Sequence, residues 1–338
     1  MSVISDPSQS EPRVSRDGLR LLVALPALNE ASTIVEVIES IPQQIEGVSR
    51  VDVMVVDDGS TDQTAELARG AGADVVRHPE RRGVGAAFHT ALAYAIDRRA
   101  DVLVTIDSDG QFDPADIPKI AIPVIEDQAD FATASRFKDM ALVPQMPWIK
   151  KWGNRQMSRL ISRLTGLQFH DVSCGMRCYG RRAMVNLNPL GKFTYTQEVF
   201  LNLAFKHMRI VEVPVRVRGV RAVGKSRVAR SLWQYGLNTL RIIFRAYRDY
   251  QPMRFFGGLA LLLAAPGFLL GGFLAIYYIR NGMFSPYKWT GFTAGTLLGL
   301  SLILLLMGMI GDMLNRHRIY LEELLARART DDRSDRGA

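Results

Sequence analysis

Residues 51–69 read VDVMVVDDGSTDQTAELAR, and this stretch contains the unit on which the fold is built. The apolar run Val51–Val56 predicts a short strand, which ends at the acidic turn Asp57-Asp58-Gly59. The segment Ser60-Thr61-Asp62-Gln63 has the spacing of a capping box and predicts the start of a helix over Thr61–Arg69. The stretch therefore predicts a strand, a turn and a helix, with carboxylates where the strand ends.

The same alternation of short apolar runs and helix-length segments extends from Leu19 to about Ala134. It predicts βαβ units, and therefore an α/β fold with a mostly parallel sheet. Asp113 before Pro114 has the pattern of a helix cap followed by a first-turn proline. In such sheets ligands bind at the carboxyl ends of the strands. The expected strands are Leu21–Leu25, Val51–Val56, Asp74–Val76, Asp101–Ile106 and Asp130–Ala134, and the expected helices are Ala31–Ile41, Thr61–Arg69, Gly85–Arg98 and Pro114–Glu126.

The sequence from Arg136 onward is less regular. It predicts helices around Asn154–Leu164 and Thr196–His207, then a strand at Arg209–Val213 and a basic, glycine-containing loop at Gly219–Arg230. Residues 231–250 then combine apolar side chains at helical spacing with arginines between them, which is typical of an interfacial membrane helix. A helix packed on the surface of a soluble core is the alternative, and the apolar stretch that follows favours the interfacial helix.

Two uncharged stretches follow, at Phe255–Ile279 and Trp289–Ile310. The first would reach about 37 Å as a helix, more than the roughly 30 Å of a hydrocarbon core. The short connector Arg280–Lys288 predicts that the two form a transmembrane hairpin, and Asp312 is expected at a solvated helix end. Two buried helices of a soluble core are the weaker alternative.

Basic residues are concentrated on one side of this hairpin. Four arginines precede the first span and four follow the second, whereas the connector holds Arg280 and Lys288. The positive-inside rule then predicts a multi-pass protein of the cell membrane, with the domain before the spans and the tail after them in the cytoplasm. The flanking arginines are Arg241, Arg245, Arg248, Arg254, Arg316, Arg318, Arg327 and Arg329.

The overall charge is +8, from 42 lysines and arginines against 34 acidic residues. Nucleic acid is not expected as the partner, because the arginines cluster beside the spans, where anionic headgroups account for them. The two cysteines, Cys174 and Cys178, have neither a second pair nor a histidine cluster nearby, so zinc is not expected. The polar residues 1–18 have no apolar core of the signal-peptide type and predict a disordered leader.

A second acidic motif, Asp107-Ser108-Asp109-Gly110-Gln111, follows the strand predicted to end at Ile106. Carboxylates two positions apart on an extended segment point the same way. Two hard oxygen ligands of this kind can hold a divalent cation that keeps further positions for phosphate oxygens. An acidic surface loop without bound metal is the plainer interpretation of the motif taken alone.

Five motifs occur in order along the chain: Pro26-Ala27-Leu28-Asn29-Glu30, Val56–Asp62, Arg82–Ala87, Asp107–Gln111 and Ala134–Phe137. Together they resemble family 2 glycosyltransferases of the GT-A fold. Two further segments, Asp171–Arg177 and Arg221–Arg227, are similar to motifs of the dolichyl and polyprenyl phosphate mannose and glucose synthases within that family. Leu28, Cys174 and Met176 stand where that group usually has tyrosine, serine and phenylalanine, and Val84 where lysine or asparagine is frequent, which leaves the choice of donor open.

The resemblance implies a catalytic domain at 19–230, preceded by the leader at 1–18 and followed by the interfacial helix at 231–254. Two membrane helices within 255–312 and a cytoplasmic tail at 313–338 complete the expected domains. By resemblance the donor nucleotide would contact Pro26, Glu30, Asp58, Arg82 and Gly85, and Mg²⁺ or Mn²⁺ on its diphosphate would be held by Asp107, Asp109 and Gln111. Arg136, with Lys150, Lys151 or Arg155, would grip the acceptor phosphate, Arg221 and Lys225 would cover the donor diphosphate, and Glu198 would contact the sugar or the metal shell.

The implied reaction is the inverting transfer of a hexose from a UDP- or GDP-sugar to polyprenyl or dolichyl phosphate. The catalytic residues would be Asp109, Arg136 and Glu198, and the partners would be the donor, the lipid acceptor and the membrane lipids. A homo-oligomer stays open. Two alternatives also stay open: a family 2 transferase with another membrane lipid as acceptor, and a non-catalytic membrane scaffold. The intact Asp107 and Asp109 pair argues against the scaffold.

Overall fold

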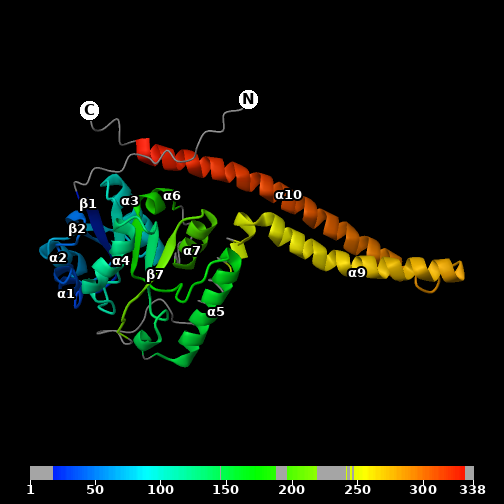
Figure 1. The fold of residues 1–338 in the computed structure, drawn as a ribbon, viewed down its shortest axis with the longest axis horizontal. Helices are drawn as coiled ribbons and strands as arrows, with labels where there is room; N and C mark the ends of the chain where they lie inside the picture. The colour runs from blue at the N-terminus through cyan, green and yellow to red at the C-terminus, as the bar shows by residue number, and fades with distance from the viewer. Residues whose placement is uncertain are drawn as a thin grey trace. The chain divides into compact units, whose positions relative to one another are not determined.

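The structure is a computed structural model, and it describes residues 18–144, 146–187, 196–218, 241, 244–245 and 247–331. The chain separates into two compact units. The first unit, residues 1–155, 173–184 and 208–225, contains the sheet; the second, residues 156–172, 185–207 and 226–338, contains the long helices near the C-terminus (Figure 1).

The first unit is built on a seven-stranded sheet with the order β3-β2-β1-β4-β6-β5-β7. Neighbouring strands are parallel except at β6, which runs antiparallel to both β4 and β5. The mostly parallel sheet and all the predicted strands are confirmed, and β6 is an addition. The strands are β1 (Leu19–Ala27), β2 (Val48–Asp57), β3 (Asp74–Arg77), β4 (Val102–Thr105), β5 (Phe131–Ser135), β6 (Arg177–Gly180) and β7 (Ile210–Pro214).

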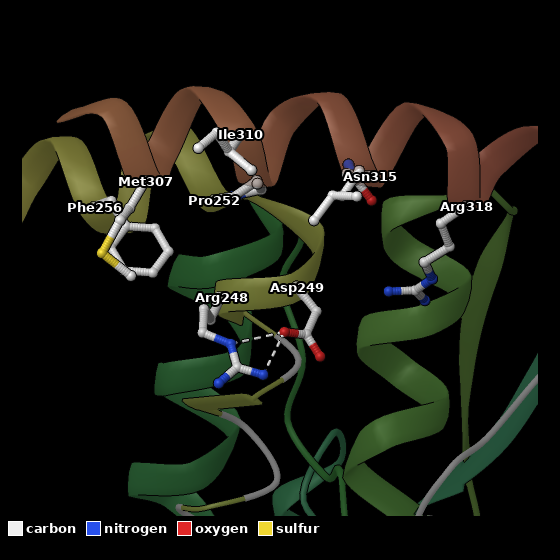
Figure 2. Close-up of a pocket in the computed structure, with 10 residues that line it drawn as sticks. Arg248, Asp249, Pro252, Phe256, Met307, Ile310, Asn315 and Arg318 are labelled. Carbon is white, nitrogen blue, oxygen red and sulfur yellow. Dashed lines mark hydrogen bonds and ion pairs between the residues drawn. The ribbon is translucent and has the colours of Figure 1, made fainter. Parts of the chain in front are cut away.

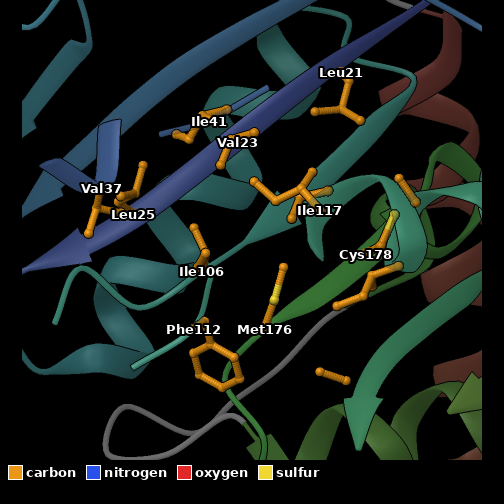
Figure 3. Close-up of a cluster of buried hydrophobic side chains, with 14 of the residues drawn as sticks. Leu21, Val23, Leu25, Val37, Ile41, Ile106, Phe112, Ile117, Met176 and Cys178 are labelled. Carbon is orange, nitrogen blue, oxygen red and sulfur yellow. The ribbon is translucent and has the colours of Figure 1, made fainter. Parts of the chain in front are cut away.

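Helices cover both faces of this sheet, so alternate side chains of β1 are buried on each face. Leu21, Val23 and Leu25 belong to one apolar cluster (Figure 3), while Leu22 and Ala24 are buried on the opposite face. The cluster includes side chains of α1 (Ile34–Glu39), α2 (Thr64–Gly70) and α4 (Ile117–Ile125), and α3 (Val84–Asp97) packs on β1 and β2. Burial on both faces is characteristic of parallel sheets.

Two predicted helix starts had different outcomes. The capping box is wrong: α2 has Gln63 at its cap position without a side-chain bond, because the Ser60 hydroxyl accepts a hydrogen bond from Asn29 N at 2.9 Å instead. Asp113 does cap its segment, accepting from Ala115 N at 3.0 Å, and begins a 3-10 turn, η1 (Pro114–Asp116), that leads into α4.

The second unit holds α7 (Thr196–Phe205), α9 (Pro252–Asn281) and α10 (Lys288–Asp331). Both α9 and α10 are long and apolar enough to cross a membrane. The expectation that the second helix ends near Asp312 is wrong, because α10 continues past it and Asp312 pairs with Arg316 one turn further at 2.9 Å. The predicted interfacial helix lies largely outside the described residues. The helices α5 (Trp148–Thr165) and α6 (Arg181–Asn186) connect the two units, and η2 (Met140–Leu142) is a short 3-10 turn.

Candidate active site

The carboxyl ends of β1, β2 and β4 lie side by side, and hydrogen bonds join the loops that follow them. Ser108 Oγ donates to Pro26 O at 2.9 Å, and Thr33 Oγ1 donates to Ser108 O at 2.8 Å. Asp58 N donates to Ala27 O at 2.9 Å, which continues the ladder between β1 and β2 into the loops. The predicted donor motifs are therefore brought to one edge of the sheet.

The loop after β1 is shaped by a residue in the left-handed region, Asn29, with a φ of 50°. Its side-chain Oδ1 accepts from Thr61 N at 2.7 Å, and Glu30 N donates to Thr64 Oγ1 at 2.9 Å. Asparagine tolerates this backbone conformation better than most residues. The half-buried Glu30 is thus fixed at the start of α2 by its own backbone.

Asp58 organises the turn that carries Arg82 and Gly85. It is 5% exposed, and its carboxylate accepts from Arg82 N at 2.9 Å and from Gly83 N at 2.8 Å. His78 Nδ1 lies 2.8 Å from the same carboxylate, and its Nε2 lies 2.9 Å from Thr90 Oγ1. Because backbone amides bind a carboxylate strongly, Asp58 fixes the path of the turn.

The preceding acid, Asp57, stabilises the same corner. It is fully buried, accepts from Ser60 N at 2.8 Å and pairs with Arg77 Nε at 3.2 Å. Gly59, which follows the two acids, has a φ of 78°, and a Cβ there would lie 2.9 Å from Arg81 N. A side chain at position 59 would therefore meet both backbone strain and a steric clash.

The second acidic motif follows β4. Asp109 is 3% exposed and accepts from Gln111 N at 3.1 Å, and Gln111 O accepts from Arg218 N at 3.0 Å. Asp107 lies against the backbone of Gly175, where a Cβ would sit 2.9 Å from the Asp107 Cγ. The absence of a side chain at Gly175 therefore makes room for the carboxylate of Asp107.

These oxygen donors are chemically suited to Mg²⁺ or Mn²⁺. Among the residues that the structure describes, no three His, Cys, Asp or Glu side chains gather into a metal cluster. Two carboxylates from one loop match the way Mg²⁺ is commonly bound beside a phosphorylated substrate, with substrate oxygens completing its coordination. The close approach of the Gly175 backbone to Asp107 and the burial of Asp109 fix both carboxylates on this loop, as binding of such an ion requires.

The predicted acceptor residues lie just after β5 and on α5. Arg136 follows β5, with its guanidinium 5.4 Å from the centre of the Phe137 ring. Lys150, Lys151 and Arg155 are exposed on the first turns of α5, a helix that begins at Trp148 and not near Asn154 as predicted. Trp148 and Trp152 are 74% and 55% exposed and, four residues apart, share one side of this helix.

Asn154 links α5 to the segment that carries Gly175, because the Ser173 hydroxyl hydrogen-bonds its Oδ1. Glu198 lies on α7 in the second unit and is 9% exposed. Arg221 and Lys225 lie outside the described residues.

Sequence reasoning missed His78 and Gly175. Only its place one residue after β3 could have drawn attention to His78, and the Asp171–Arg177 motif contained Gly175.

The mostly parallel sheet, with acidic loops at the carboxyl ends of β2 and β4, defines an α/β domain of the class that binds ligands at this edge. The particular family is glycosyl transferase family 2, whose sequence pattern matches residues 22–187, and this chain belongs to it. A dolichyl-phosphate hexose transferase of Haloferax volcanii is 32% identical over 220 residues, covering 62% of this chain and 92% of that protein.

A second relative and a solved structure are also similar to this chain. A UDP-N-acetylglucosamine–dolichyl-phosphate N-acetylglucosaminyltransferase of Methanococcus voltae is 27% identical over 216 residues, covering 58% of this chain and 84% of that protein. Glucosyl-3-phosphoglycerate synthase of Mycobacterium tuberculosis, solved with Mn²⁺, UDP and its product, is 24% identical with a TM-score of 0.53, covering 70% of this chain and 81% of that one. The GT-A fold and the assignment as a glycosyltransferase are confirmed.

Proposed function

We propose that this chain transfers a hexose, with inversion, from a UDP- or GDP-sugar to polyprenyl or dolichyl phosphate at the cytoplasmic face of a membrane. The observation that carries the proposal is the combination of a family 2 transferase domain with two helices long enough to span a bilayer. Such helices hold a catalytic domain at the headgroup plane, where a lipid phosphate presents its reactive oxygen. Relatives named as dolichyl-phosphate sugar transferases support this acceptor.

The donor would bind at the carboxyl edge of β1, β2 and β4. Pro26 and Glu30 would contact the nucleotide, and Asp58 would hold the turn of Arg82 and Gly85 against it. Asp107, Asp109 and Gln111 would bind Mg²⁺ or Mn²⁺, which would neutralise the charge that develops on the nucleoside diphosphate. The relative solved with Mn²⁺ and UDP supports this choice of cofactor.

In the reaction, an acceptor phosphate oxygen forms a bond to the anomeric carbon while the bond from that carbon to the donor diphosphate breaks. The attacking oxygen is already anionic, so no strong general base is required. Arg136, with Lys150, Lys151 or Arg155, would hold the acceptor phosphate, and Arg221 and Lys225 would cover the diphosphate. Catalysis would then come from positioning and charge stabilisation, with Glu198 beside the sugar.

The reaction is tested by incubating the purified protein with undecaprenyl phosphate and a panel of UDP- and GDP-sugars, and identifying the glycolipid by mass. Undecaprenol and diacylglycerol serve as acceptors without a phosphate. A hexosyl undecaprenyl phosphate is the expected product. Transfer to diacylglycerol alone would show that the chain is a transferase for another membrane lipid. The absence of product with every donor would refute the proposal.

The orientation is tested by cysteine labelling. The native Cys174 and Cys178 are buried, with exposed fractions of 1% and 0%. The labelling signal therefore comes mainly from the introduced cysteine. A cysteine at Ser285, between the spans, is expected to react with an impermeant reagent from the outer side, and one at Ser334 is not. The reverse pattern would reject a cytoplasmic catalytic domain.

A further inference from the structure

Beyond Ile310, one face of α10 binds α7 through a half-buried aromatic residue, Tyr250. The Tyr250 hydroxyl accepts a hydrogen bond from Asn202 Nδ2 of α7 at 2.6 Å, and the Tyr250 ring lies 5.0 Å from that of Phe205. The guanidinium of Arg318 on α10 lies 3.9 Å from the centre of the Tyr250 ring. Tyr250 is thus held between the two helices, and burial raises its pKa.

Two ion pairs extend this contact. Glu322 of α10 pairs with Lys206, just after α7, at 2.9 Å and with Arg318 at 2.8 Å. The side chains of Lys206 and Glu322 are only 16% and 17% exposed. Burial lowers the pKa of Lys206, and its hydrogen bond to Glu322 opposes that effect. We call Asn202, Lys206, Tyr250, Arg318 and Glu322 the α10 clasp.

The same helix is also fixed against the start of α9. A Cβ at Gly311 would lie 2.7 Å from Pro252 Cβ, and Asn315 Nδ2 donates to Tyr250 O at 3.3 Å. Figure 2 shows Asn315 and Arg318 on α10 beside the pocket that also contains Pro252. Further along, Arg329 donates to Val185 O at 2.8 Å. Positions 311, 315, 318, 322 and 329 recur at helical spacing and therefore lie on one face of α10.

Neighbouring charges on α10 make a useful contrast. Glu323 pairs with Arg327 one turn away, but their side chains are 52% and 69% exposed. Exposed pairs of this kind contribute little to stability. The paired charges of the α10 clasp are half-buried, so breaking one pair leaves an uncompensated charge that is partly shielded from water.

We propose that the α10 clasp fixes the orientation of α7 and, with it, the orientation of Glu198, the residue that the proposed function places beside the sugar. The inference rests on the proposed function. Glu198 lies one turn before Asn202 on the same face of α7. A shift of Asn202 therefore also moves the carboxylate of Glu198. A helix of 10 residues is marginal alone and takes its orientation from tertiary contacts. The clasp residues are positioning residues and touch no substrate.

The test uses the full chain in lipid nanodiscs and three variants: Glu322→Gln, Tyr250→Phe and the matched control Glu323→Gln. Glu322→Gln and Tyr250→Phe are expected to speed amide exchange in α7 and to lower kcat about tenfold, with the donor KM within twofold. Tyr250→Phe retains the ring and removes only the hydroxyl. Glu323→Gln changes neither measurement. Transfer is measured with the donor and undecaprenyl phosphate that the wild type uses.

Unchanged exchange in α7 for both clasp variants would overturn the clasp itself. Faster exchange with unchanged kcat would overturn the positioning role, because α7 could then move without consequence for the reaction. A wild type that transfers no sugar would overturn the proposed function and the catalytic half of this inference, while the exchange comparison would still decide whether α10 holds α7.

Discussion

The two ends of the sheet hold acidic residues in different ways. At the amino end, carboxylates meet arginine side chains: Asp130 pairs with Arg209 at 3.1 Å and Arg182 at 3.6 Å, and Asp52 pairs with Arg50 at 2.6 Å. At the carboxyl end, Asp57 also pairs with Arg77, but Asp58 and Asp109 accept hydrogen bonds from backbone amides of the loops beside them.

This difference between arginine and backbone-amide partners distinguishes carboxylates that stabilise the fold from carboxylates available for the reaction. An arginine partner satisfies a carboxylate and fixes two segments of chain, which suits a structural role. A backbone amide orients a carboxylate without adding a neutralising positive charge, which suits an acid that meets a metal ion or a substrate. The comparison predicts that changes at the carboxyl end abolish transfer in a folded protein, whereas changes at the amino end destabilise a protein that still transfers.

Asp109→Asn should have the largest effect. Losing one charged oxygen ligand should lower kcat by at least about a hundredfold, because a bound cation contributes several kcal/mol to stabilising the transition state. Turnover and thermal unfolding are measured together, with Asp107→Asn as a second variant, and the unfolding temperature should change little. Full turnover of these variants, or of the wild type in EDTA, would exclude the metal role.

Gly175→Ala comes next. The new Cβ would lie 2.9 Å from Asp107 Cγ and displace its carboxylate, so kcat should fall by up to about a hundredfold. Gly70→Ala is the control, because a Cβ at Gly70 meets nothing within 4 Å. Equal turnover in both variants would mean that the close approach of Gly175 and Asp107 has no catalytic role.

Arg136→Ala should affect only the acceptor. Losing one charge-assisted contact costs about 1.5–3 kcal/mol, so the KM for polyprenyl phosphate should rise roughly ten- to a hundredfold with lower turnover. Calorimetry with the donor and Mn²⁺ should give an unchanged affinity, and Arg50→Ala removes a positive charge at the opposite end of the sheet as a control. Lost donor affinity with a normal acceptor KM would assign Arg136 to the donor site.

Asp130→Asn should have the smallest effect and act on stability. Burial raises the pKa of Asp130, but hydrogen bonds from Arg209 outweigh it and lower the pKa below its usual range. The folded pKa is below the unfolded one, so the stabilisation is full above about pH 3.9 and is lost as pH falls through the folded value. The variant should lose about 1–2 kcal/mol of unfolding free energy at pH 7.

That loss should shrink in acid, and turnover at pH 7 should stay near that of the wild type. The measurement is denaturant unfolding in detergent at several pH values. A loss that is independent of pH would show that the Asp130 carboxylate is not the group that titrates, and a large loss of turnover would remove the distinction between the two ends of the sheet.

Some features of the second unit were readable in the sequence and overlooked. The helix beyond Asp312 is marked by pairs four residues apart, Arg318 with Glu322 and Glu323 with Arg327, which stabilise a helix after its apolar stretch has ended. Counting only apolar residues ended the helix near Ile310. No local pattern, in contrast, points from Tyr250 to Asn202, because their contact joins segments 48 residues apart.

The sequence by itself determined the strand and helix alternation, the acidic loops after β2 and β4, and the two long apolar helices. These features depend on periodicity, length and composition, which are local properties of a chain. The tertiary structure alone decided the antiparallel insertion of β6, the contact of His78 with Asp58, the approach of Gly175 to Asp107, and the clasp between α10 and α7. Each of these depends on distances between residues far apart in the chain, which only the packing of the folded protein sets.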